Sequence, residues 1–297
     1  MISFVFVAFK RRDLPVAMMQ CPQRTLALVK SIADLPKDIR PSGIIFEEPL
    51  GEYFGDEVAN WTSAIRKVMD DNDWVSKFQQ DAKGIDGMLL YHVHEQYGLA
   101  NATVLDALAG GADGMWCGLS EEGAPMGHAC SAVALTNLAR LGNKHVMAEY
   151  NTENLVSAAR KVAVATTGKP VPSKQVVYGS SAVDVCFSFS SIAQGYRADD
   201  VDYDGNGVLN ELDKFSVANL IGLKDPPVRV STLASSSLIT RRLTQCFGDK
   251  VFFTDDRSRG LLVEIKRRLT NNVKEEYTQP CQLGKLWNDV YPEHCLV

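Results

Sequence analysis

Two histidines, His92 and His94, stand one residue apart where the apolar run 87–90 ends. On a β-strand, residues i and i+2 point to the same face, so the two imidazoles are expected to project side by side. Imidazoles in this arrangement can share one divalent cation. The alternative is a pair of inert, hydrogen-bonded histidines on a half-buried strand. Because Ala/Leu-rich sequence follows and α/β sites lie at the carboxyl ends of strands, the position favours a metal site.

A second candidate ion site is the segment 202–213, with the sequence DYDGNGVLNELD. It fits the loop of an EF-hand, which places oxygen ligands at alternating positions and a glycine at the sharp turn. The predicted calcium ligands are Asp202, Asp204, Asn206, Val208 through its carbonyl, Asn210 and Asp213. Asp213 stands where a glutamate is usual, so weaker calcium binding or some magnesium preference is expected. A polar surface turn without an ion is the alternative.

Acidic side chains follow the strands that neighbour the two histidines. Glu47 and Glu48 close one apolar run, Glu95 follows His94, and Glu122 lies in the next loop. Because the carboxyl ends of parallel strands meet at one edge of a sheet, these loops are expected to converge. Convergent acids favour a hard divalent cation. The candidate bases, or partners that orient the imidazoles, are Glu48, Glu95 and Glu122.

The elements that must position these residues alternate between strand and helix from residue 43 to about 185. Strands are predicted at 43–49, 87–94 and 112–119, and helices around 58–68, 101–109 and 129–140. Near-continuous apolar strands in repeated βα units are typical of a parallel sheet covered by helices. The predicted fold class is therefore α/β.

Composition limits the possible partners and the compartment. The chain has 297 residues and a net charge of −5, with no basic run longer than 10–12, which argues against nucleic acid as a partner. Its seven cysteines include no C-x-x-C pair, which predicts reduced thiols in a cytoplasmic compartment. The apolar start, 1–9, has its positive charges after it and is about half as long as a membrane span, so a buried strand and no membrane association are expected.

The run from Gly43 to Gly179 resembles the carboxyl-terminal half of the DRE-TIM metallolyase barrels, the pyruvate carboxyltransferase and HMG-CoA-lyase-like family. Residues 92–95 and 98–102 are similar to the family's H-x-H and G-x-A-x-A block on its sixth strand. In the family, a Gly-Asn pair after the seventh strand completes the metal shell. Here His128 stands where the Asn is expected, so the resemblance implies His128 as a third ligand. The segment 168–179 is similar to the end of the isopropylmalate-synthase-type barrel.

One departure from the family concerns the Arg-Asp pair on the first strand, whose Asp ligates the metal. The corresponding residues here are Arg12 and Asp13, about 80 residues before His92. That separation is too short for the five strands that intervene in the family. Either the first strands are missing, or the barrel is rebuilt or completed by another chain. A solvated charge pair in a turn is the alternative reading of Arg12 and Asp13.

Together these features predict a partial (β/α) TIM-type barrel over 1–185, an EF-hand segment over 186–225 and a helical tail over 226–297, with helices near 232–243 and 261–269. The resemblance implies a carbon–carbon lyase or condensing enzyme. Its divalent cation (Mg, Mn or Zn) would bind the oxygens of a 2-oxo acid or acyl-CoA and stabilise an enolate. An open sheet edge predicts self-association or a partner that completes the barrel. The alternative function is a non-catalytic calcium-binding protein that retains a degenerate half-barrel.

Overall fold

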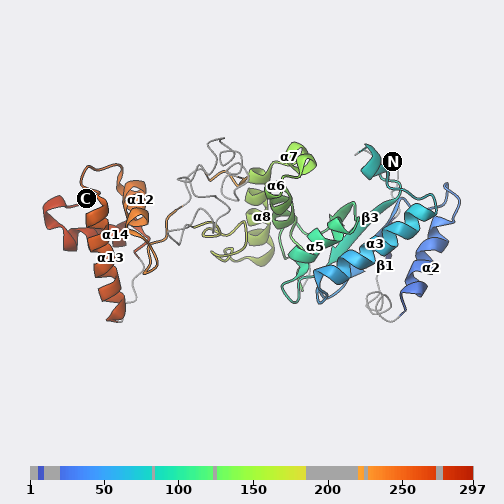
Figure 1. Ribbon diagram of the computed structural model, residues 1–297, viewed down its shortest axis with the longest axis horizontal. Helices are drawn as coiled ribbons and strands as arrows, with labels where there is room; N and C mark the ends of the chain where they lie inside the picture. Colours follow the sequence, from blue (N-terminus) through green and yellow to red (C-terminus); the bar gives the residue numbers. More distant parts are fainter. Residues whose placement is uncertain are drawn as a thin grey trace, which may run out of the picture. The chain divides into compact units, whose positions relative to one another are not determined.

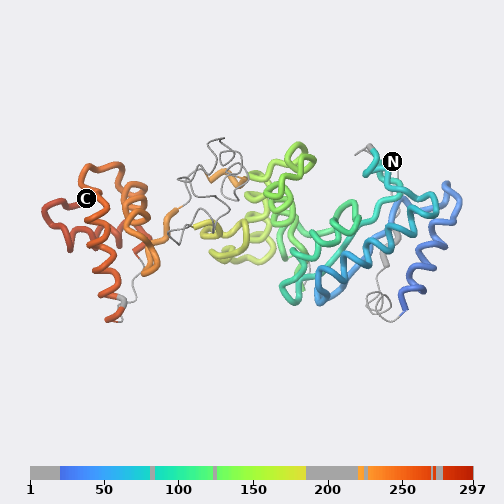
Figure 2. The backbone as a smooth tube through the Cα atoms, viewed as in Figure 1, coloured from blue at the N-terminus to red at the C-terminus, as the bar shows by residue number. Residues whose placement is uncertain are grey.

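The computed structural model describes residues 6–9, 21–81, 84–122, 126–184, 220–223, 227–271 and 277–296. The chain divides into two compact units, one of residues 1–138 and 145–171 and one of residues 139–144 and 172–297. The backbone within each unit can be followed in Figure 2. The predicted boundaries at 185 and 225, the whole calcium loop 202–213, and Arg12 with Asp13 lie outside the described residues. They therefore stay predictions.

The first unit is built on a parallel sheet of four strands in the order β1-β2-β3-β4. The strands are β1 (Phe6–Phe9), β2 (Gly43–Glu48), β3 (Met88–Val93) and β4 (Gly114–Trp116). Each strand pairs with the next one along the chain, which is the order within the wall of a (β/α) barrel, whereas doubly wound sheets reverse their strand order. The predicted parallel α/β sheet is confirmed, with strands somewhat shorter than expected.

Helices cover one face of this sheet (Figure 1). They are α2 (Pro22–Ala33), α3 (Gly55–Asp71) and α5 (Ala100–Ala109), and a short helix, α4 (Lys77–Asp81), precedes β3. Apolar side chains of these helices, among them Val29, Ile65 and Val104, pack against Phe46 and Tyr91 of the sheet. Because side chains alternate along a strand, the residues next to Phe46 and Tyr91 point to the other face, away from the helices.

The expected alternation of strand and helix up to residue 185 is wrong after β4. The chain continues with α6 (Ser131–Arg140), α7 (Lys144–Glu149) and α8 (Thr152–Thr167), and residues 168–184 form turns and loops without a strand. In α8 the buried residues Val156, Ala159 and Ala163 recur three and four positions apart, which is the spacing of a helix face. Because residues 168–184 contain no strand, the segment 168–179, which is similar in sequence to the end of a barrel, adds none to the sheet.

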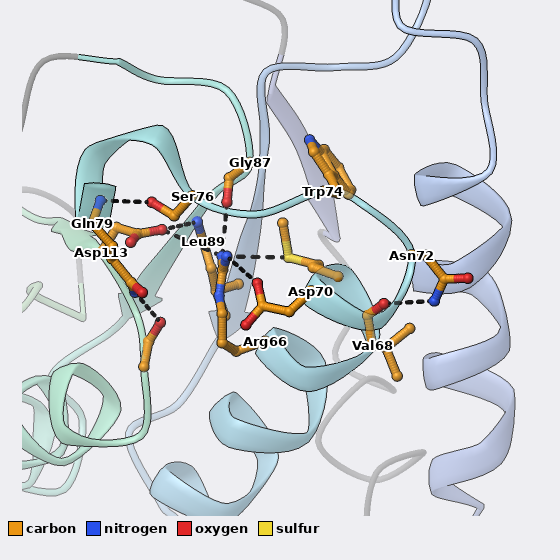
Figure 3. A network of polar contacts seen from close by, with 12 residues as sticks. Arg66, Val68, Asp70, Asn72, Trp74, Ser76, Gln79, Gly87, Leu89 and Asp113 are labelled. Atoms are coloured by element: carbon orange, nitrogen blue, oxygen red, sulfur yellow. Dashed lines mark hydrogen bonds and ion pairs between the residues drawn. The ribbon is translucent and has the colours of Figure 1, made fainter. Parts of the chain in front are cut away.

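Arg66, on α3, fastens the amino ends of β3 and β4 (Figure 3). Its Nη2 donates to the carbonyl of Gly87 at 2.8 Å and forms an ion pair with Asp113 at 3.3 Å. The same Asp113 carboxylate accepts the N–H of Leu89 at 2.7 Å. The side chains of Arg66 and Asp113 are only 8% and 0% exposed, so this polar network is part of the core. It lies at the end of the strands opposite the histidines and has a structural role.

The second unit contains the predicted helical tail. Its helices are α12 (Ser236–Phe247), α13 (Asp255–Thr270) and α14 (Pro280–Val290), followed by the short helix η1 (Pro292–His294). They share a core that includes Ile239, Leu261 and Trp287. The first tail helix begins later than the predicted Thr232, because Oγ of Ser235 accepts the N–H of Leu238 at 3.3 Å and caps the helix there. Among the described residues, no helix has the length and apolarity that crossing a membrane requires.

Candidate metal centre

Three histidines converge at the carboxyl end of β3. His92 is on β3, His94 comes directly after it, and His128 pairs with His94 through an isolated antiparallel bridge. One ligand nitrogen from each ring lies within 4.8 Å of those of the other two. The ring centroids are 4.4 Å apart for His94 and His128, and 4.9 and 5.0 Å from His92 to His128 and His94. The structure thus brings together all three residues predicted as ligands of the barrel metal.

Backbone carbonyls fix the orientation of two of the rings. Nδ1 of His92 lies 2.6 Å from the carbonyl oxygen of Trp116, and Nδ1 of His94 lies 3.2 Å from that of Gly127. A carbonyl only accepts hydrogen bonds, so each Nδ1 carries a proton, and in the neutral form of each ring the lone pair is on Nε2. Metal-binding histidines use this same outer hydrogen bond to set their tautomer and ring direction.

The third ring, His128, is held in the neutral state by its surroundings. Burial, and the proximity of His94 and His92, lower the pKa of His128 from 6.5 to about 4. At neutral pH its imidazole is therefore unprotonated and can offer a nitrogen lone pair to a cation. The neutral ring of His128 favours a metal ion over a proton as its partner.

Glu47 places a carboxylate beside the histidines. It is the register partner of His92 across β2 and β3, so both side chains lie on the sheet face that points away from the helices. Its Oε1 lies 3.7 Å from Nε2 of His94, while its Oε2 is buried without a hydrogen-bond partner. A buried carboxylate oxygen without a partner is unfavourable. A cation or a substrate proton in the adjacent space would supply that partner.

These groups open into a cavity of about 420 Å³. Its described lining residues are Glu47, His92, His94, Trp116, Cys117, Gly118 and His128. Trp116 forms one wall, with its ring centroid 5.0 Å from that of His92 and 46% of the residue exposed. Burial raises the pKa of the Cys117 thiol to about 11, so without a bound cation this side chain is protonated at neutral pH.

The structure does not bring the predicted Glu48 to this cavity. Adjacent strand residues point to opposite faces, and Glu48 is fully buried on the helix-covered face, where it pairs in register with Val93. Its Oε1 accepts the N–H of Leu50 at 3.1 Å, and burial raises the pKa of its carboxyl group. Glu48 therefore holds the loop after β2. The other predicted acids, Glu95 and Glu122, are not among the cavity's described lining residues.

Glu47 and Trp116 are not among the predicted site residues. Glu47, His92 and Trp116 form a row across three strands in register. If the register of β2 and β3 had been known, the residue opposite His92 would have been identified as Glu47, and Glu47 would have been chosen over Glu48. The strand of Trp116 has three residues, too few to show an alternation of its own.

Comparison with known proteins assigns no family. No protein-family model matches the sequence, and no curated protein matches it. The chain is similar to the carboxyl transferase domain from Rhizobium etli pyruvate carboxylase with pyruvate, at 12% identity and a TM-score of 0.40, over 90% of this chain and 37% of that one. A variant of that domain with pyruvate gives 14% identity and a TM-score of 0.38 over the same shares. The chain thus spans little more than a third of these solved structures, and the likeness is too weak to carry a functional argument.

Proposed function

We propose that this protein binds one divalent transition-metal cation through Nε2 of His92, Nε2 of His94 and a ring nitrogen of His128. The convergence of the three rings, two of them fixed through Nδ1, is the observation that carries the proposal. Three imidazoles with an open position are typical of catalytic zinc sites. Mg²⁺ prefers oxygen ligands, so among the predicted metals Zn²⁺ fits this donor set better.

The chemistry that we propose for this centre is enolisation of a small 2-oxo acid. When bound, the cation would act as a Lewis acid that stabilises negative charge on a substrate oxygen. Glu47 takes the role of general base, with Oε1 or Oε2 accepting the proton from the carbon next to the carbonyl. Trp116 shields this side of the cavity from water. A condensing activity of the kind that the family resemblance implies would begin with this proton removal, and a lyase activity would end with the reverse step, return of a proton to that carbon.

The lining of the cavity favours a 2-oxo acid over an acyl-CoA. Among its described lining residues there is no lysine or arginine to balance a substrate carboxylate. A 2-oxo acid offers its keto and carboxylate oxygens side by side, which suits a site whose positive charge comes from one cation. The thioester of an acyl-CoA offers a single carbonyl oxygen to the cation. The phosphates of its CoA part would find no lysine or arginine among the described lining residues of this cavity.

Two further proposals follow from the sequence. We propose a calcium site at 202–213, which makes a non-catalytic calcium-binding protein the competing function. We also propose that the sheet is part of a (β/α) barrel, completed by a second copy or another chain, because β1 and β4 are its edge strands among the described residues. Light scattering of the purified chain over a concentration series tests self-association.

Metal analysis of the purified chain tests the central proposal. One equivalent of Zn²⁺ or another transition metal is expected per chain, and His92→Ala with His94→Ala should abolish it. His145→Ala is the matched control, because His145 is exposed and outside the cluster. The loaded protein should exchange the methyl protons of pyruvate for deuterium, followed by NMR in D₂O. Unchanged metal content in the double variant would refute the site. Bound metal without exchange would refute the chemistry and favour the non-catalytic alternative.

A further inference from the structure

Asn101, in the first turn of α5, joins the two ends of the segment that carries His128. Its Nδ2 donates to Oε1 of Glu121 at 3.1 Å, at the start of that segment. Its Oδ1 accepts the backbone N–H of Cys130 at 2.8 Å, at the end of it. One side chain therefore uses both its donor and its acceptor to span the base of the loop.

The position of His128 depends on both of these ends. The backbone N–H of His128 donates to the carbonyl of Glu121 at 2.9 Å, and Cys130 follows only two residues later. Gly127, the residue before His128, has φ +76°, a left-handed conformation that favours glycine. Its carbonyl accepts from Nδ1 of His94. A displacement of Glu121 or Cys130 would therefore carry the His128 ring with it.

Metal coordination is sensitive to such a displacement. Zn–N bonds are about 2.0–2.1 Å long, and the ligand atoms of a site have to be held within about 0.5 Å of the positions that binding requires. His92 and His94 are fixed by β3 and by their own carbonyl partners. His128 is the ligand that comes from a loop. Its neighbours Gly127 and Ala129 form backbone hydrogen bonds with Glu95 and Val93, and Asn101 adds a side-chain support at both ends of the loop.

We propose that Asn101 is a positioning residue of the metal centre, which acts by holding His128 against His92 and His94 and does not touch the cation. This inference rests on the proposed metal site. The asparagine amide suits this place because one end of the contact needs an acceptor and the other a donor. An aspartate in its place would still accept from Cys130 but would set two carboxylates against each other at Glu121.

The test measures Co²⁺ and Zn²⁺ affinity and the visible spectrum of bound Co²⁺ for the full chain and its variants. Asn101→Ala should weaken binding about 10- to 100-fold, as loss of an outer partner does elsewhere. It should also shift the Co²⁺ spectrum toward that of His128→Ala. In the His128→Ala background, Asn101→Ala should have no further effect. In Asn101→Asp combined with Glu121→Gln, the amide at position 121 donates to the carboxylate at position 101, so the hydrogen bond is kept with its direction reversed. This double variant should restore the affinity for Co²⁺ and Zn²⁺.

Asn72→Ala is the matched control. It removes a 2.7 Å hydrogen bond from an asparagine side chain to Val68 in the same unit, at the end of α3. Thermal melts check that each variant is folded, and if Asn101→Ala does not fold, Asn101→Asp with and without Glu121→Gln gives the answer. Unchanged affinity and spectrum in the Asn101 variants, with metal bound by the wild type, would overturn this inference alone. An equal loss in the His128→Ala background would also overturn it. A wild type that binds neither ion would overturn the metal site and this inference together.

Discussion

Glu47 and His92 are register partners on neighbouring parallel strands, and both face away from the helices. One residue further along, Glu48 pairs with Val93 and is buried on the opposite face. Two consecutive glutamates therefore have different roles. Glu47 faces the imidazoles and the cavity, whereas Glu48 binds the backbone of the loop after β2.

Changing Glu47 to Gln should slow proton exchange of pyruvate by about 10²–10⁴-fold, because loss of a general base removes a contribution of this size. Metal content should persist, since three histidines remain. Deuterium incorporation measured by NMR, at equal metal occupancy, gives the rate. Glu48→Gln is the control, and its rate per folded molecule should match that of the wild type. Equal rates for the wild type and Glu47→Gln would remove Glu47 from the mechanism.

The stability of the metal-free protein should depend on pH through His128. The pKa of His128 is about 4 in the folded chain, against 6.5 ordinarily. Between these values the unfolded chain binds a proton at this position and the folded chain does not, so the free energy of unfolding falls as the pH decreases from 6.5 to 4. Partial exposure limits the loss to about 1–2 kcal/mol.

Urea unfolding at pH 7 and pH 4.5, with chelator present, measures this loss. In His128→Gln the titrating group is absent, so the decrease in the free energy of unfolding should be smaller by that amount. The same decrease in both proteins would show that the His128 ring is not held neutral by its neighbours.

The residues alone were sufficient to predict the sheet and the pair His92 and His94, and the family resemblance added His128, but the carboxylate of Glu47 beside them was not predicted. The apolar runs that end at Phe46 and Leu90 predict strands, and the spacing of His92 and His94 predicts their common face. The register between two strands depends on packing across the whole sheet, so the choice between Glu47 and Glu48 was not available locally. Likewise the similarity of 168–179 to a barrel end did not predict the turns that residues 168–184 form.

Removing the Asp113 carboxylate should strongly destabilise the first unit. Asp113→Ala leaves the buried Arg66 with only the partly exposed Asp70 as an ion-pair partner and the N–H of Leu89 without its acceptor, so the free energy of unfolding should fall by about 3 kcal/mol. Lys67→Met is the control on the same helix. It breaks an exposed ion pair with Asp71 and should leave stability nearly unchanged. Denaturant unfolding followed by circular dichroism compares them, and similar effects of the two changes would contradict a core role for the Arg66 network.

Calcium should stabilise the chain if the loop 202–213 binds it. A ligand that binds only the folded state adds about 2.7 kcal/mol at a hundredfold excess over its dissociation constant. Melting curves with millimolar calcium against chelator should therefore differ for the wild type. They should coincide for Asp202→Ala combined with Asp204→Ala. Without any shift in the wild type, the loop would be a polar turn.

Trp116 makes the centre optically observable. Its indole lies 5.0 Å from the imidazole of His92 and is partly in solvent, whereas Trp74 and Trp287 are fully buried. An excited indole at this range is quenched by a protonated imidazole or by a paramagnetic ion such as Co²⁺ or Cu²⁺, while diamagnetic Zn²⁺ lacks that effect. Quenching on acidification of the metal-free protein therefore reports protonation, and quenching on addition of Co²⁺ or Cu²⁺ at constant neutral pH reports a loaded centre. Trp116→Phe, in which Trp61, Trp74 and Trp287 still emit, supplies the reference.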